Sequence, residues 1–459
     1  MFKIDSMKMF TKKLSLLLLV GGLATNVFAQ EKKWTLEECI AYALDHNINV
    51  KQSQNNAAIS AENLKEAKSA FLPNANASVN QNINTGFSID PFSNERVEET
   101  VRTNSLSFSS GVTLFNGFQL QNAKKESISN FEASKLDVEK MKNDIAMNVA
   151  LAYLQVLFNN ELVSIAERQL NTTKIQVDRL SELVEAGSIA KGSLLDVESQ
   201  YAAEEQQLVN ARNQRDLARL NIMQLLELDS DQAFQVSVPE NINTNELVKG
   251  TPIDIYQKAL GMQPQIKASE LRVSSSEYSL LQAKGSRYPS LSMSGGISSF
   301  YSSAARQLAA DGRALEEIPF NEQIDNNQSL TLGFSLQIPI FNRNQVNTMI
   351  ARTQLNLENS RLLAVQEKRN LRKNIEQAYA DAVASMKQYI ASDKAVMAFE
   401  ESFSYMQERY NLGMVNSFEY NDAKNKYMKA ESDRLQAKYD YAFKIQILEF
   451  YATNNLTLD

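Results

Sequence analysis

Four short segments of the chain alternate regularly between apolar residues and small polar residues. Leu106 and Phe108, for example, stand between Ser105, Ser107 and Ser109. An alternation with a period of two residues predicts a β-strand with one apolar face and one polar face. The pattern places these strands at about residues 73–84, 103–115, 289–301 and 328–341.

A helical pattern follows each pair of strands. Apolar residues recur there at steps of three and four up to Gly187 and up to Gly413, and no proline interrupts either hairpin. A proline costs a helix interior about 3 kcal/mol and a glycine about 1 kcal/mol, so their near absence permits long unbroken helices. The pattern predicts two helical hairpins, at about residues 117–228 and 344–450. Their period of about 3.5 residues is typical of coiled coils.

The two halves of the chain are copies of each other. Pro73 corresponds to Pro289, Phe115-Asn116 corresponds to Phe341-Asn342, and Gly187 corresponds to Gly413. We therefore expect a first repeat over residues 30–240 and a second over 241–459, each with a short helix, two strands and a hairpin. A duplication of this length indicates an assembly with internal pseudo-symmetry rather than a solenoid of short units.

The first residues have the pattern of an export signal. Lysines precede an apolar run from Leu14 to Leu23, and small residues follow at the positions that a signal peptidase reads, ending at Ala29. The run is too short to span a bilayer as a helix, which takes about 20 residues. We expect residues 1–29 to be a cleaved signal peptide and no later segment to be a transmembrane helix. The mature chain then crosses a membrane with strands or not at all.

Composition and charge exclude several classes of function. The chain has one cysteine, Cys39, and one histidine, His46, so it forms neither an internal disulfide nor a Cys/His metal cluster. A net charge of −7 without a basic stripe argues against a nucleic-acid partner. The sequence shows no nucleophile motif and no phosphate-binding motif. We expect neither enzymatic activity nor a cofactor.

Amphipathic strands in an exported chain are typical of an outer-membrane barrel. A half-buried sheet in a soluble domain is the other interpretation of the strands, which the signal peptide and the uncharged polar face disfavour. Four strands cannot close a barrel, because the smallest membrane barrels have about 8, and open edges are not tolerated in hydrocarbon. Several copies of the chain must therefore share one barrel.

The chain resembles the TolC-type outer-membrane efflux proteins over essentially all of its mature length. The motifs that carry the resemblance are Thr35-Leu36-Glu37-Glu38, Ala43-Leu44, Leu72-Pro73, Tyr288-Pro289, Leu114-Phe115-Asn116-Gly117 and Ile340-Phe341-Asn342-Arg343, together with the tip glycines. The resemblance implies a mixed α+β membrane protein, a homotrimer with a shared 12-stranded transmembrane β-barrel of four strands per chain. That barrel would continue into a long periplasmic α-helical coiled-coil barrel. Residues 85–102 and 304–327 would be extracellular loops.

The function that the resemblance implies is that of an outer-membrane exit channel in a Gram-negative, diderm cell. Such a channel carries small molecules or secreted substrates, in complex with a periplasmic adaptor (membrane fusion) protein and an inner-membrane transporter, and contacts outer-membrane lipid. A secreted or surface coiled-coil structural protein or adhesin is the alternative, and it accounts for the helices but not for the duplicated strands. A periplasmic adaptor would carry only one hairpin beside β-rich domains.

The resemblance also assigns the hairpin tips, where the family's tunnel narrows and meets the adaptor. The matching residues are Gly187, Ser188 and Ile189 in the first tip and Gly413, Met414 and Val415 in the second. We expect both glycines to adopt left-handed conformations that end the long helices.

Two further sites follow from the same comparison. Glu419 and Asp422 match inward-pointing acids, so three copies would form a pore-constriction ring that favours cations. The other interpretation is that acids in the first turns suit the helix dipole. Asp196 and Tyr410 match a candidate gate pair between hairpins. Asp196 could instead complete a capping box with Ser193, and Tyr410 could pack in the coiled-coil core.

Overall fold

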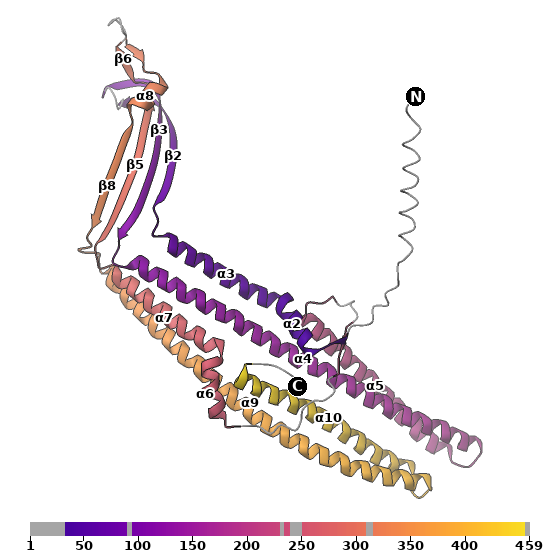
Figure 1. Cartoon of the computed structure of the whole chain (residues 1–459). Helices are drawn as coiled ribbons and strands as arrows, with labels where there is room; N and C mark the ends of the chain where they lie inside the picture. The colour runs from indigo at the N-terminus through magenta and orange to yellow at the C-terminus, as the bar shows by residue number, and fades with distance from the viewer. Residues whose placement is uncertain (1–32, 90–93, 230–233, 239–249, 309–314, 455–459) are drawn as a thin grey trace, which may run out of the picture.

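The computed structural model describes residues 33–89, 94–229, 234–238, 250–308 and 315–454. The expected signal peptide and the expected boundary between the repeats lie outside these ranges. The molecule is elongated, with a β-sheet at one end and two helical hairpins at the other (Figure 1). Shorter helices flank the long ones between these two ends.

The β-sheet has four antiparallel strands, in the order β2-β3-β5-β8. They are β2 (Asn74–Ile89), β3 (Arg96–Phe115), β5 (Ser290–Ser302) and β8 (Ser329–Gln337). The two repeats meet at the centre of the sheet, where β3 pairs with β5. Phe108 lies opposite Ile297, which lies opposite Leu330 on the other side, so the apolar residues of neighbouring strands share one face. Strands β2 and β8 have open edges within the chain.

The first pair of strands is longer than the alternation predicts. The ladder between β2 and β3 continues from Thr85 opposite Thr100 to Ile89 opposite Arg96. The expectation that residues 85–102 form a loop is therefore wrong. Backbone groups make the ladder, so polar and charged residues continue a hairpin beyond its apolar band. The second predicted loop, 304–327, contains β6 (Arg306–Leu308), β7 (Leu315–Glu317) and α8 (Phe320–Asn326).

The fourth strand is shorter than expected, since β8 ends at Gln337 rather than near residue 341. Pro339 follows two residues later. A proline has no backbone N–H to donate to the ladder, which limits it to edges and ends of strands.

Besides α8, the described residues form eight helices, which lie beyond one end of the sheet (Figure 1). They are α2 (Leu36–His46), α3 (Ile48–Ser69), α4 (Gln119–Glu185), α5 (Lys191–Leu225), α6 (Pro252–Met262), α7 (Pro264–Gly285), α9 (Gln345–Asn411) and α10 (Ser417–Thr453). Helices α4 and α9 have 67 residues each, a length of roughly 100 Å at 1.5 Å per residue. Each turns back at its glycine into its partner, α4 into α5 and α9 into α10, as the sequence pattern predicts.

The main core lies where α2 packs on the middle of α4. Val149, Tyr153 and Leu157 of α4 are buried there against Cys39, which is fully buried as a small apolar residue. The Tyr153 hydroxyl lies 2.5 Å from the Ser237 carbonyl oxygen. It therefore ties α4 to the small sheet of β1 (Lys33–Trp34) and β4 (Gln235–Val236).

Among the described residues, α4 is long and apolar enough to cross a membrane by length and composition alone. Most of that apolar window is buried inside the protein, 61% of it. A helix whose apolar surface is covered by other helices is a core helix, and the coiled-coil packing of α4 accounts for its composition.

Candidate functional site at the hairpin tips

Glycines in the left-handed conformation end both long helices. Gly187 has φ +68 and Gly413 has φ +72, as the sequence predicts. The Ser188 amide donates to the Leu183 carbonyl at 2.8 Å, and the Gly187 amide donates to Val184 at 2.9 Å. This pair of bonds is the Schellman motif, which satisfies the last carbonyls of a helix.

The second tip repeats the motif. The Met414 amide donates to the Arg409 carbonyl at 2.9 Å, and the Gly413 amide donates to Tyr410 at 3.0 Å. Met414 and its neighbour Leu412 are exposed. The first tip differs, because Ile189 packs against the small cluster of Leu180, Leu194 and Val197. The second tip therefore exposes more apolar surface than the first.

The two predicted ring acids are both exposed on α10. Glu419 completes a capping box, in which its backbone amide donates to Asn416 Oδ1 at 2.9 Å and its carboxylate accepts from the Asn416 amide at 3.4 Å. Asp422 pairs with Lys426 Nζ at 2.6 Å. Glu419 thus has a local role at the helix start as well as an exposed carboxylate.

The predicted gate pair is not joined within one chain. Tyr410 stacks on Tyr420 instead, with ring centroids 4.7 Å apart, and Asp196 is exposed on α5. The capping interpretation of Asp196 is wrong: α5 begins after Ala190 without a side-chain cap, and Ser193 already lies inside the helix.

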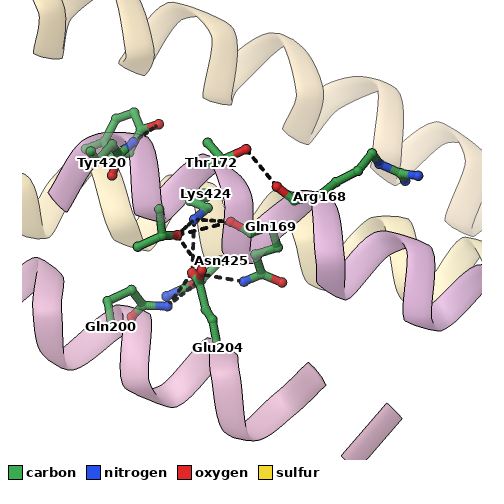
Figure 2. Close-up of polar contacts among 10 residues, drawn as sticks. Arg168, Gln169, Thr172, Gln200, Glu204, Tyr420, Lys424 and Asn425 are labelled. Atoms are coloured by element: carbon green, nitrogen blue, oxygen red, sulfur yellow. Dashed lines mark hydrogen bonds and ion pairs between the residues drawn. The ribbon is translucent and has the colours of Figure 1, made fainter. Parts of the chain in front are cut away.

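A buried polar cluster, which the sequence analysis missed, lies above the tips. Lys424 of α10 is fully buried and donates to Glu204 Oε1 of α5 at 2.9 Å. Lys424 also donates to the Gln169 carbonyl at 3.4 Å and to the hydroxyl of Thr173. The Thr173 hydroxyl in turn donates to Glu204 Oε2. Figure 2 shows the lysine from α10 reaching between Gln169 of α4 and Glu204 of α5. The cluster therefore joins the second hairpin to both helices of the first.

The carboxylate of Glu204 has further donors. Gln169 Nε2 donates to Oε1 at 3.2 Å, and Gln200 Nε2 donates to the same atom at 2.9 Å. The Gln200 amide also reaches Asn425 Oδ1 at 3.3 Å. The buried charges are paired and hydrogen-bonded, which is the condition under which a protein interior holds them.

Burial shifts the pKa of two groups on this face of α10. It lowers the pKa of Lys424, while the charge of Glu204 and its hydrogen bond act in the opposite direction. It raises the pKa of Tyr420 to about 12, against the hydrogen bond that Gln176 donates to the Tyr420 hydroxyl.

One signal of the cluster was present in the sequence. Thr173 occupies an apolar slot of the α4 stripe, and a polar residue in such a slot needs a partner when buried. Nothing local marks Lys424 or Glu204, because both look like solvated residues on helix faces.

Comparison with known proteins identifies the class of protein. The sequence matches the family described as Outer membrane efflux protein over residues 39–227 and again over 255–450. It is 21% identical over 444 residues to the Outer membrane efflux protein BepC of Brucella suis, covering 96% of this chain and 90% of that protein. It is 21% identical over 385 residues to the Outer membrane protein TolC of Escherichia coli, covering 83% and 74%.

The fold is similar to that of solved channels. The Campylobacter jejuni CmeC outer membrane channel superposes with a TM-score of 0.75 at 17% identity, over 91% of this chain and 85% of that chain. The chain belongs to the outer membrane efflux protein family. It is an efflux channel of the TolC family, not an enzyme, with two repeats of long helices and strands.

Proposed function

We propose that three copies of the chain form one outer-membrane exit channel, with a shared 12-stranded barrel continuous with a tunnel of helical hairpins. The observation that carries this proposal is the four-stranded sheet with one apolar face and two open edges. In three copies arranged in a ring, β8 of one chain would pair with β2 of the next. Every backbone group within the hydrocarbon would then have a partner, as a membrane requires.

The two faces of the sheet suit opposite environments. Val79, Phe108, Ile297, Leu332 and Phe334 lie on one face, and each is more than half exposed in the single chain. An apolar surface of this kind marks an interaction site, and outer-membrane lipid is the partner that fits a band of amphipathic strands. The other face carries serine, threonine and asparagine, which would line the pore without charge.

The tips would narrow the far end of the tunnel. Glu419 and Asp422, repeated in three chains, would form a ring of acidic side chains that attracts cations and repels anions. Asp196 and Tyr410 stay a candidate gate pair between neighbouring chains, since both lie near the tips and are not joined within one chain.

The route of the cargo follows from this arrangement. Residues 1–29 would direct export and be cleaved, placing the hairpins in the periplasm of a Gram-negative cell. The tips, with Gly187, Ser188 and Ile189 in one and Gly413, Met414 and Val415 in the other, would contact a periplasmic adaptor that connects the channel to an inner-membrane transporter. The exposed Met414 and Leu412 supply apolar surface for that contact.

Purified protein in detergent tests the assembly and the ring together. We expect a heat-stable trimer that inserts into planar bilayers and gives discrete, cation-selective channels. Glu419→Gln/Asp422→Asn should move the reversal potential in a KCl gradient toward zero, and Gln at position 419 preserves the capping box. Asp433→Asn, on the exposed surface of α10 farther from the tip, is the matched control.

Each outcome separates one part of the proposal from the rest. Conducting trimers with unchanged selectivity in the double variant would remove the acidic ring and keep the channel. A soluble protein that does not insert would overturn the barrel and favour the coiled-coil fibre.

A further inference from the structure

The buried cluster and the acidic pair lie on opposite sides of one helix. Tyr420 and Lys424, four residues apart on α10, are 2% and 0% exposed. A helix turns about 100° per residue, so Asp422 projects about 160° and Glu419 about 140° away from Lys424. Whatever sets the direction of Lys424 also sets the direction of both acids.

The hydrogen bonds of the buried cluster can all form at only one rotation of α10 about its helix axis. Lys424 uses its three N–H donors on Glu204, Thr173 and Gln169, and Glu204 accepts from three side-chain nitrogens at the same time. Rotating α10 by a single residue would withdraw the lysine and leave Glu204 buried without a cation. An uncompensated buried charge is strongly unfavourable.

The other charged contacts of this region do not impose such a restriction. Arg168 of α4 pairs with Glu431 of α10 at 2.9 Å; the glutamate side chain is 18% exposed, but the arginine side chain is 60% exposed and stays in contact with water. Asp422 and Lys426 belong to the same helix. Exposed ion pairs tolerate changes of geometry at little cost because water replaces them.

We infer that Lys424 is a positioning residue for the acidic constriction: its buried ion pair with Glu204, through Thr173, fixes the rotation of α10 so that Glu419 and Asp422 face the pore. This inference rests on the proposed trimeric channel and its acidic ring. Buried ion pairs contribute little net stability compared with apolar residues of similar volume, and their best-attested role is to specify one arrangement.

The matched variants are Lys424→Met/Glu204→Met, which replaces the buried pair by apolar residues, and Arg212→Met/Glu167→Met. The second pair removes an ion pair within the first hairpin, 2.8 Å long and about half exposed on both sides. Selectivity is measured as the reversal potential of full-length trimers in a KCl gradient. We expect the buried-pair variant to move at least halfway toward the value of Glu419→Gln/Asp422→Asn, and the exposed-pair variant to stay at the wild-type value.

Crosslinking gives a readout that does not require an open channel. In a Cys39→Ser background, Asp422→Cys places one thiol per chain at the proposed ring. A bifunctional thiol reagent should join neighbouring chains efficiently, and Lys424→Met/Glu204→Met should lower that yield severalfold. Thr173→Val, which removes only the hydroxyl between the two charges, is a milder second variant that should change the yield in the same direction.

The results distinguish the positioning role of Lys424 from the proposed acidic ring and channel on which it rests. Unchanged selectivity and unchanged crosslinking in trimers that carry the buried-pair or Thr173→Val substitutions would overturn the positioning role and leave the ring intact. If Glu419→Gln/Asp422→Asn itself conducts with wild-type selectivity, the ring and its positioning fall together, while the channel remains.

Discussion

Tyr410 at the end of α9 stacks on Tyr420 near the start of α10, with ring centroids 4.7 Å apart and ring planes inclined by 30°. The Tyr420 hydroxyl accepts a hydrogen bond from Gln176 Nε2 of α4 at 2.5 Å. One aromatic side chain thus connects both helices of the second hairpin to the first hairpin. The connection lies just above the tips, where the proposed channel narrows.

Tyr420→Phe should change how stability depends on alkaline pH. Burial raises the pKa of Tyr420 from 10.0 to about 12, so the native state keeps the phenolic proton longer than the unfolded state. The stability that this group contributes is fully present below about pH 10 and is lost as the pH rises toward about 12. The stability gap between wild type and Tyr420→Phe, about 1 kcal/mol from the lost hydrogen bond, should therefore narrow across that range.

Chemical unfolding of detergent-purified trimers at a series of pH values, followed by circular dichroism, measures this gap. Tyr405→Phe is the matched control, because Tyr405 is exposed on α9. A gap for Tyr420→Phe that stays constant through the alkaline range would contradict the buried position of the ring.

Substitution of the tip glycines should destabilise the protein because of their backbone conformation and not because of a steric clash. A Cβ at Gly187 or Gly413 would meet no atom within 4 Å, but both residues have positive φ. The left-handed conformation costs an L-residue about 1–2 kcal/mol, so Gly187→Ala and Gly413→Ala should each lower the melting temperature of the trimer. Gly192→Ala, inside α5 and equally open, should be neutral or stabilising by about 0.5–1 kcal/mol. Equal effects at all three positions would argue against this account.

Adjacent residues of β8 should respond oppositely to a charge. Leu332 lies on the apolar face, where it is 69% exposed in the single chain, and Thr331 lies on the polar face. A lysine on the lipid face of a barrel costs about 2–4 kcal/mol near the bilayer midplane. We expect Leu332→Lys to reduce folding into lipid vesicles, and Thr331→Lys to fold normally and reduce cation conductance. Normal folding of Leu332→Lys would place that face away from lipid.

The junction between the sheet and the helices should not tolerate an added methyl group. A Cβ at Gly285, the last residue of α7, would meet the Gly117 carbonyl oxygen well inside contact distance, and a Cβ at Gly117 would meet Gly285 in the same way. Both neighbours are backbone atoms, so neither can turn aside. Gly285→Ala should destabilise the protein by about 1–3 kcal/mol or more. This loss of stability should lower the yield of heat-stable trimer, which is the quantity measured. Gly261→Ala, which meets nothing within 4 Å, is the control and should leave the yield unchanged.

The repeated turn between the second strand of each half and the long helix that follows it was located by motif comparison. Gly117 and Phe118 both have positive φ, and so do their counterparts Arg343 and Asn344. The duplicated Phe-Asn motif located these turns before the structure did. It did not reveal that Arg343 adopts a left-handed conformation that glycine adopts in the first repeat, because an arginine carries no local preference for positive φ.

The sequence by itself determined the strands, the long hairpins, their glycine turns and the duplication. These features depend on local periodicity and on the backbone preferences of glycine and proline. Both can be read from short stretches of the sequence. Tertiary structure alone decided that Lys424 of the second hairpin is buried against Glu204 and Thr173 of the first. Lys424 is more than 200 positions from both of these residues. A buried lysine is favourable only when its partners are present, so no local pattern encodes the contact.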